Sequence, residues 1–320
     1  MREVTPLFLF SVPRSGSTMV QRVLAAHPEV ATAPEPWILL PLLYALRREG
    51  IYAEYNHGYA AAALEDFCRD LPGGSGDYLA ELRVFALRLY SKAAGGEARY
   101  FLDKTPRYHL VVEDVMRLFP EGKFVFLWRD PLAVVASVMR TWGRGRWNLH
   151  LREVDLFDGL SNLISAYEKH GGEAYAVRYE DLVRDPEEWR RLFGYLDLAF
   201  DPGVLSRFAD VRLGGRMGDP TGAAGYQEIS SEPLHKWKST PANPIRKAWL
   251  RGYLRWLGRD RLAVMRYDTN SLLSELDAIP NTSNMLASDT ARLGYQWLES
   301  KVLKDKGALP PSLLKAHTRL

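Results

Sequence analysis

Residues 13–18, PRSGST, combine an arginine with small hydroxyl-bearing residues, between an apolar run and an amphipathic pattern. We expect residues 7–12 to form a buried strand and residues 18–26 to form a helix. Backbone amides at the start of a helix bind anions, helped by the positive end of the helix dipole. The residues that we expect to hold such an anion are Arg14, Ser15, Gly16, Ser17 and Thr18.

This segment lacks two diagnostic residues of the nucleoside-triphosphate loop G-x-x-x-x-G-K-[ST]. When that pattern is aligned on Gly16, Ser11 stands in place of the first glycine and Ser17 in place of the lysine. Arg14 can instead supply a cation from the loop itself. The alternative is that a strand-to-helix turn favours glycine and serine without holding any ligand.

A second candidate for anion binding is the segment RDPLAVVASVMR, residues 129–140. Arg129 follows an apolar run at residues 123–128, and Pro131 occupies a favoured first position of a helix. Ser137 follows Arg129 by about two helical turns, so both side chains can contact one phosphate. The alternative is a capped helix with a solvated arginine.

The elements that must position these residues alternate between strand and helix. The expected strands are residues 7–12, 99–104, 123–128 and 174–178, the last near an edge of the sheet. The expected helices are residues 18–26, 79–93, 110–118, 132–139, 156–169 and 186–196. Such alternation predicts an α/β fold with a parallel sheet, whose ligands bind beyond the carboxyl ends of the strands. Residues 13–18 and 129–131 are therefore expected on the same rim.

The domain organisation follows from a change of pattern late in the chain. Residues 211–244 are rich in glycine, proline and serine and are expected to form a long functional loop. A helical pattern returns at residues 245–267 and weakens after Asp268. We therefore predict one catalytic domain, residues 1–268, followed by a C-terminal helical tail, residues 269–320.

The composition is that of an ordinary globular protein and narrows the classes of function. Of the 320 residues, 47% are hydrophobic and 25% charged, with a net charge of +3, which suits an anionic ligand and not nucleic acid. No apolar run reaches the length of about 18 residues that a membrane span needs. The first residues do not resemble a signal peptide, and the single cysteine, Cys68, cannot form an intrachain disulfide. We expect a cytoplasmic protein.

Taken together, the two anion-binding candidates resemble those of sulfotransferases that use 3′-phosphoadenosine-5′-phosphosulfate (PAPS). PRSGST is similar to that family's 5′-phosphosulfate loop, and Arg129 with Ser137 is similar to its 3′-phosphate site. The resemblance covers about residues 5–265. It implies a P-loop-like, three-layer fold with a central parallel sheet flanked by helices. The resemblance also explains why the loop lacks the lysine of nucleoside-triphosphate loops, because PAPS has no triphosphate bridged by Mg²⁺ to neutralise. We therefore expect no metal.

Two later segments extend the resemblance. Residues 178–198 resemble a segment whose tyrosine, here Tyr179, lies beside the nucleotide. The triplet HKW, residues 235–237, resembles a late motif whose lysine, here Lys236, reaches the phosphates of the nucleotide. The expected cofactor is PAPS, and its product is 3′,5′-adenosine bisphosphate (PAP).

The resemblance also implies which residues do the chemistry. Lys104, in FLDKTPRY, matches a lysine that stabilises the leaving phosphate, and Arg14 assists from the loop. Cytosolic aryl and steroid sulfotransferases have a catalytic histidine two residues after that lysine, where this chain has Pro106. Tyrosylprotein sulfotransferases resemble residues 27–35, HPEVATAPE, and Glu35 matches their catalytic base. His109 stays open as the alternative base.

The acceptor is expected to bear a hydroxyl group. Residues 139–152, MRTWGRGRWNLHLR, mix arginine with tryptophan, which suits a sugar or an anionic acceptor. The alternative is that this segment is a solvated flap, which can have the same composition. A carbohydrate or glycolipid ranks above a β-hydroxyacyl chain, because nothing resembles a carrier-protein domain or a partner thioesterase. Other small molecules and peptides remain open as acceptors.

Two rival classes of function are an ATP-dependent small-molecule kinase and a nucleotide-binding module without catalysis. The missing Walker lysine argues against the kinase. Presence of Glu35 and Lys104 together with the anion-binding residues argues against the inactive module.

Overall fold

A computed structural model describes residues 3–51, 53–96, 98–214 and 228–294. The chain divides into two compact units, residues 1–128 with 165–229 and residues 129–164 with 230–320. Parts of the expected loop at residues 211–244 and of the expected tail at residues 269–320 lie outside the described residues.

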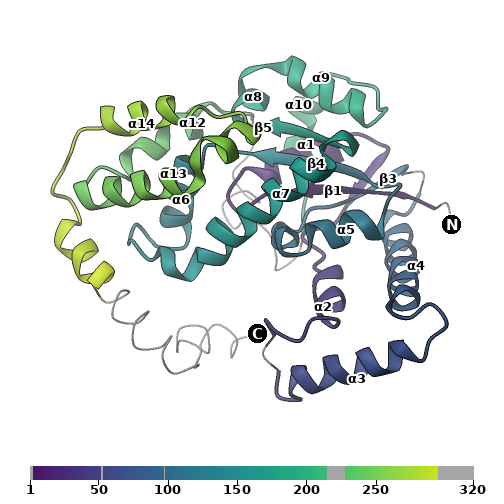
Figure 1. The fold of residues 1–320 in the computed structure, drawn as a ribbon. Coiled ribbons are helices and arrows are strands. Elements are labelled where there is room, and N and C mark those ends of the chain that lie inside the picture. The colour runs from purple at the N-terminus through teal and green to yellow at the C-terminus, as the bar shows by residue number, and fades with distance from the viewer. Residues whose placement is uncertain (1–2, 52, 97, 215–227, 295–320) are drawn as a thin grey trace. The chain divides into compact units, whose positions relative to one another are not determined.

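The first unit contains a parallel sheet of five strands in the order β2-β3-β1-β4-β5 (Figure 1). The strands are β1 (Thr5–Phe10), β2 (Val30–Thr32), β3 (Tyr100–Asp103), β4 (Lys123–Trp128) and β5 (Ala174–Arg178). Helices lie against the sheet, and the predicted α/β fold class is confirmed. The expected position of residues 174–178 at an edge of the sheet is also confirmed.

Two strands differ from the sequence prediction. β1 covers residues 5–10 and not 7–12, because its register pairs Thr5 with Tyr100 and leaves Ser11 and Val12 in the following loop. The sequence analysis missed β2, whose three residues are too few to show a periodic pattern. Pairing of Val30 with Tyr100 makes it an edge strand.

Helices of the first unit cover both faces of the sheet, and Figure 1 shows α4 and α5 on one side with α9 and α10 on the other. Their bounds are α1 (Ser17–Ala25), α2 (Leu39–Tyr44), α3 (His57–Arg69), α4 (Ser75–Ala94), α5 (Val112–Leu118), α8 (Tyr179–Arg184), α9 (Pro186–Tyr195) and α10 (Val204–Arg207), with 3-10 turns η1 (Pro106–Leu110), η4 (Gly171–Glu173) and η5 (Phe208–Asp210). The expected helix at residues 110–118 is thus divided between η1 and α5.

Aromatic side chains make the core between the sheet and the helices on the α4 side. The Phe8 and Phe124 rings stack at 5.9 Å between neighbouring strands, and Tyr90 of α4 meets Phe8 edge-on at 6.4 Å. Such pairs stabilise a core beyond the area that they bury. Phe126 in turn lies 5.3 Å from Tyr167 on α7 (Leu160–His170).

The second unit is helical. Its elements are α6 (Pro131–Thr141), η2 (Leu149–Arg152), η3 (Val154–Gly159), the start of α7, α12 (Glu232–Lys236), η6 (Trp237–Ser239), α13 (Pro244–Val264) and α14 (Thr269–Ala278). The expected helix at residues 156–169 is wound as a π-helix over η3 before α7 begins. α13 bends at Gly258, which has a φ of 71°.

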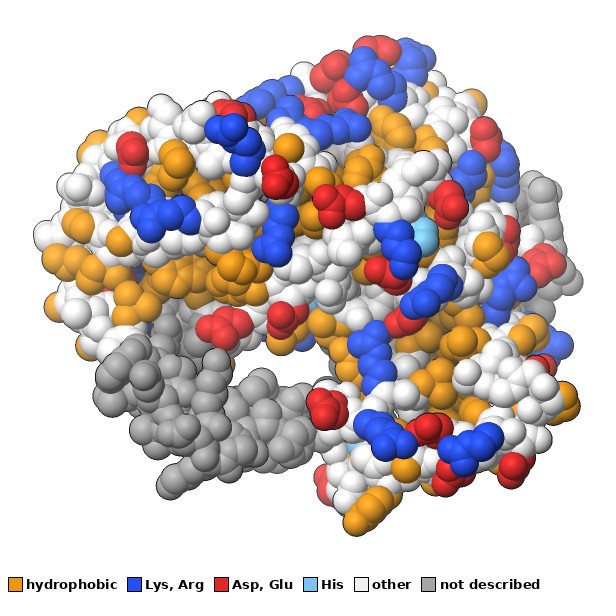
Figure 2. All heavy atoms as spheres, viewed as in Figure 1, with side chains coloured by type: hydrophobic (Ala, Val, Ile, Leu, Met, Phe, Trp, Pro, Cys, Tyr) orange, Lys and Arg blue, Asp and Glu red, His pale blue; other side chains and the backbone are white. Residues whose placement is uncertain are grey.

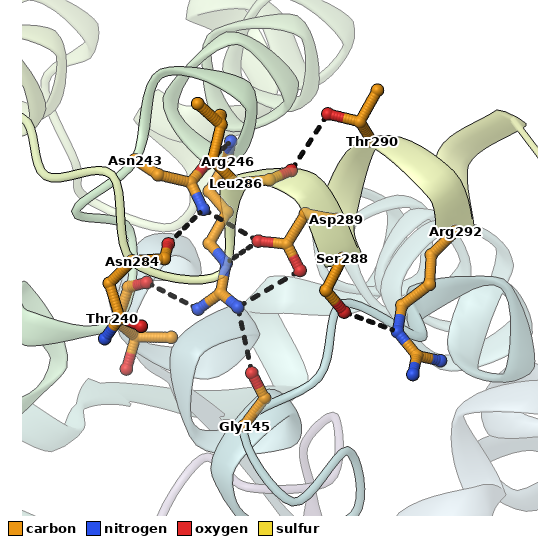
Figure 3. Close-up of polar contacts among 10 residues, drawn as sticks. All are labelled: Gly145, Thr240, Asn243, Arg246, Asn284, Leu286, Ser288, Asp289, Thr290 and Arg292. Carbon is orange, nitrogen blue, oxygen red and sulfur yellow. Dashed lines mark hydrogen bonds and ion pairs between the residues drawn. The ribbon is translucent and has the colours of Figure 1, made fainter.

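A buried ion pair in the second unit joins two residues that lie far apart in the sequence (Figure 3). Arg246 of α13 donates to both carboxylate oxygens of Asp289, at 2.6 and 3.2 Å, and the Asp289 side chain is fully buried. The same guanidinium donates to the carbonyl of Gly145 at 2.9 Å, and Asn243 donates to Asp289 at 2.7 Å. Residues after 268 are thereby tied to α13 and to residues 143–146.

Basic and acidic side chains are interspersed over the visible face of the molecule (Figure 2). On α3, for example, Arg69 pairs with Asp66 at 2.9 Å. Of the helices in the described ranges, none combines the length and the apolar character needed to cross a bilayer.

Candidate functional site

The loop between β1 and α1 has the features of an anion site. Ser15 is fully buried, and within the described part of the chain the hydroxyls of Ser11 and Ser15 find no hydrogen-bond partner. The N-cap residue of α1 is Gly16, which has no side chain to cap the first amides of the helix. Arg14 and Gly16 have φ angles of 72° and 91°, and alternation of such residues curves backbone amides around a concavity.

Tyr179 closes one side of this loop. A Cβ atom on Gly16 would lie 2.4 Å from Cδ2 of the Tyr179 ring, so only glycine fits there. Tyr179 itself is buried at the first position of α8, directly after β5. The structure therefore brings together two sequence-predicted parts of the nucleotide site that are more than 160 residues apart.

These residues fit the phosphate end of the expected nucleotide. Two buried hydroxyls, uncapped amides and a positive helix end together satisfy an oxyanion, and leaving buried hydroxyls unpaired has a free-energy cost. We infer that Ser11, which the sequence analysis did not select, belongs to this site. The signal for Ser11 in the sequence was that it occupies the first glycine position of the pattern G-x-x-x-x-G-K-[ST].

Glu35 and Lys104 lie on the same rim of the sheet as the loop. Lys104 directly follows β3, which pairs with β1, and Glu35 comes three residues after β2, which pairs with β3, so both follow the carboxyl ends of neighbouring strands. Gln21 of α1 donates to Thr32 Oγ1 at 2.8 Å and to the Ala33 carbonyl at 2.9 Å. These bonds tie the helix behind the anion loop to the segment that leads to Glu35.

The side chains of Glu35 and Lys104 form an ion pair. Lys104 Nζ lies 2.8 Å from Glu35 Oε1, and the two side chains are 2% and 12% exposed. Trp37 Nε1 donates to the other carboxylate oxygen at 3.3 Å. A base and a cation are thus held together in a largely buried place, where charge–charge interactions are stronger than in water.

His109 occupies a different setting. It lies in η1 with its side chain buried, 1% exposed. His109 stays the alternative base of the sequence analysis.

Arg129, Ser137 and Lys236 belong to the second unit. Arg129 and Ser137 are both buried, at 7% and 5% exposed. The Arg129 guanidinium donates to the Pro233 carbonyl of α12 at 3.4 Å, which brings the arginine to the helix that carries Lys236. The Lys236 ammonium itself is half exposed and pairs with Glu232 at 2.9 Å.

The arginine and tryptophan segment at residues 139–152 divides into core and surface. Trp147 is 1% exposed, with the Arg246 guanidinium 5.3 Å from its ring centre, so this ring belongs to the core. Trp142 is 38% exposed and carries the Arg152 guanidinium over its ring at 4.2 Å. Only the second pair has the exposure that contact with an acceptor requires.

Among the described residues, no group of three or more His, Cys, Asp or Glu side chains has an arrangement that could hold a metal ion.

Sequence reasoning missed Asp103, and it considered Trp37 only for an acceptor cleft or the core, not for its contact with Glu35. Asp103 is buried at the end of β3, and burial raises the pKa of its carboxyl to about 6, against the lowering effect of three hydroxyl groups that donate to it. A carboxylate immediately before the expected catalytic lysine was the available signal.

Comparisons with known proteins identify the family of the chain. The model of the sulfotransferase family matches residues 6–202. Nodulation protein NoeE of Sinorhizobium fredii is 38% identical over 254 residues, 66% of this chain and 58% of that protein. A protein-tyrosine sulfotransferase of Drosophila melanogaster is 26% identical over 223 residues, 64% of this chain and 40% of that protein. The chain thus spans about half the length of the curated relatives it matches.

Similarity of fold is seen with the solved sulfotransferase domain from the curacin biosynthetic pathway, with a TM-score of 0.50 and 24% identity. The superposition covers 75% of this chain and 92% of that domain. With more than half of its length matched by the family model, the chain belongs to the sulfotransferase family.

Proposed function

We propose that the protein transfers the sulfuryl group of PAPS to a hydroxyl group of an acceptor. The observation that carries this proposal is the Lys104–Glu35 ion pair of 2.8 Å, on the rim of the sheet where the anion loop also begins. Family membership supports the reaction type, and the unpaired hydroxyls of Ser11 and Ser15 support an oxyanion in the loop.

Each side chain then has a distinct part in the transfer. PAPS supplies an activated sulfuryl group on a phosphate leaving group. Glu35 accepts the proton of the acceptor hydroxyl as its oxygen bonds to sulfur, while the bond from sulfur to the bridging phosphate oxygen breaks. Lys104 and Arg14 stabilise the negative charge that develops on the departing phosphate. The products are the sulfate ester and PAP, with the proton on Glu35.

The nucleotide is held by two groups of residues in this proposal. Ser15, Gly16, Ser17 and Thr18 hold the 5′ end, with Tyr179 beside it. Arg129 and Ser137 hold the 3′-phosphate, and Lys236 reaches the phosphates once it leaves Glu232. The burial of Arg129 supports its part, because a buried guanidinium makes strong hydrogen bonds to phosphate.

A carbohydrate is the proposed acceptor. The support is the exposed Trp142 ring with Arg152 over it, a combination that suits the apolar face of a sugar and a neighbouring negative charge. We further propose that residues 1–268 form the catalytic domain and residues 269–320 a C-terminal tail. A cytoplasmic location stays a prediction.

A transfer assay with ³⁵S-labelled PAPS tests the proposal. Acceptor arms are an oligosaccharide panel, a tyrosine-containing peptide and a hydroxylated acyl chain, each with and without EDTA. We expect labelled sulfate ester on oligosaccharides with EDTA present. Label on the peptide or acyl chain alone would overturn the acceptor class. Phosphate transfer from ATP with Mg²⁺, without any sulfate transfer, would overturn the reaction type.

A further inference from the structure

Three hydroxyl groups converge on the buried carboxylate of Asp103. Thr105 Oγ1 donates to Oδ1 at 2.8 Å, while Tyr108 and Tyr90 donate to Oδ2 at 3.0 and 2.7 Å. Asp103 is 1% exposed, and the charge of the neighbouring Lys104 lowers its pKa against the effect of burial. The proposed transfer mechanism uses none of these contacts.

Two of the three hydroxyls also accept a hydrogen bond from the segment that follows Glu35. Thr105 Oγ1 accepts from the backbone amide of Trp37 at 3.3 Å, and the Tyr108 hydroxyl accepts from the amide of Leu39 at 3.2 Å. A hydroxyl has only one proton, so donation to Asp103 turns its lone pairs towards these amides. The carboxylate thereby sets the direction of both bonds.

The Trp37 backbone needs such support. Its φ of 58° lies in the left-handed region, which is costly for any residue with a Cβ and persists only where the surroundings impose it. In this conformation the indole Nε1 donates to Glu35 Oε2 at 3.3 Å, while Lys104 donates to Oε1. Lys104, which directly follows Asp103 in the sequence, therefore orients Oε1 of Glu35. Trp37, whose backbone amide is bonded to Asp103 through Thr105, orients Oε2.

We propose that Asp103 is a positioning residue for Glu35, acting through Thr105 and Tyr108 on residues 37–39. This inference rests on the proposed function, because it assigns a purpose to the orientation of Glu35. Asp103 does not touch the reacting atoms. It holds the backbone in the strained form that keeps the Trp37 indole on Glu35.

Tyr90 offers a matched control. Its hydroxyl makes the same kind of bond to Asp103 from α4, but none of the hydrogen bonds described for Tyr90 reaches residues 35–39. Tyr90→Phe therefore removes one donor from Asp103 and leaves both anchored amides in place. Thr105→Val and Tyr108→Phe each remove one donor and one anchor at nearly constant volume.

The first measurement needs no activity. Hydrogen–deuterium exchange by NMR follows the Trp37 and Leu39 amides, and the indole signal of Trp37 is assigned by its loss in Trp37→Phe. We expect the Trp37 amide to exchange at least tenfold faster in Thr105→Val and the Leu39 amide in Tyr108→Phe. Neither amide should change in Tyr90→Phe. Equal exchange in all three variants would overturn the positioning role.

The second measurement is kcat of sulfuryl transfer together with affinity for PAP. Because displacement of a reacting group by about 1 Å can lower a rate about 10²-fold, we expect Thr105→Val to lower kcat by about ten- to a hundredfold with unchanged PAP affinity. Tyr90→Phe should stay within about twofold. An equal fall of kcat in Tyr90→Phe would overturn the proposal. Absence of transfer by the unmutated protein would instead overturn the proposed function, and the exchange result would still stand.

Discussion

The Tyr179 ring covers Gly16 so closely that a Cβ at this glycine would lie 2.4 Å from Cδ2 of the ring. This contact joins the loop after the central strand β1 to the start of α8, which follows the edge strand β5.

Gly16→Ala should therefore abolish binding of PAP, because either the ring or the loop must move. A matched control is Gly95→Ala, since Gly95 also has a positive φ, 58°, but has open space where a Cβ would be. The control should show only the backbone penalty, about 1–3 kcal/mol of unfolding free energy, with PAP affinity unchanged. Calorimetric titration with PAP and urea unfolding measure the two effects. Unchanged PAP affinity in Gly16→Ala would contradict the assigned loop.

Glu35→Gln should lower turnover by about 10²- to 10⁴-fold while PAP affinity stays the same, because the amide keeps the shape of the side chain and loses its basicity. Single-turnover transfer from labelled PAPS measures the chemical step. His109→Ala serves as the comparison. If Glu35→Gln turns over normally and His109→Ala is inactive, the histidine is the base.

Arg129→Ala should remove the preference for PAP over 5′-AMP. Loss of a charged hydrogen bond to phosphate costs about 1.5–3 kcal/mol, which corresponds to roughly ten- to a hundredfold in affinity for PAP alone. Arg117→Ala removes the same charge from the exposed surface of α5, where it pairs with Asp114, and is the control. Equal affinities for PAP and 5′-AMP in the unmutated protein would refute the 3′-phosphate site.

Asp289→Asn should lower the free energy of unfolding of the second unit by about 3–5 kcal/mol, because it leaves the buried Arg246 guanidinium without its counter-charge. Asp277→Asn removes one partner of the exposed pair with Arg251 and should cost at most about 1 kcal/mol. Urea unfolding followed by tryptophan fluorescence compares the two variants. Similar losses in both would show that the buried pair contributes no more than a surface pair.

Stability should depend on the protonation of Asp103. Its pKa of about 6 lies above the ordinary value of 3.8, so between these values the folded state binds more protons than the unfolded state. The contribution of Asp103 to stability is therefore greatest below pH 4 and falls as the pH rises through 6. The difference in unfolding free energy between the unmutated protein and Asp103→Asn should decrease from pH 4 to pH 7. A difference that rises over this range would contradict the assigned direction.

Much of the sheet was predictable from local sequence. Residues 123–128 and 174–178 form strands with the expected bounds, because continuous apolar runs flanked by turn residues are typical of buried parallel strands. The strand, the loop of small residues and the helix that follow one another over residues 5–25 were also predictable in kind from local sequence, and the anion-binding role of the loop stays a prediction.

Only the tertiary structure decided how the separate segments meet. The family resemblance identified Glu35 and Lys104 as candidates, but their 2.8 Å contact follows from β2 and β3 lying side by side, and β2 is too short to be recognised from sequence. The contacts that Asp103 and Trp37 make likewise depend on the tertiary structure. Burial and a left-handed backbone arise from packing and from hydrogen bonds between segments more than 60 residues apart, which no local pattern encodes.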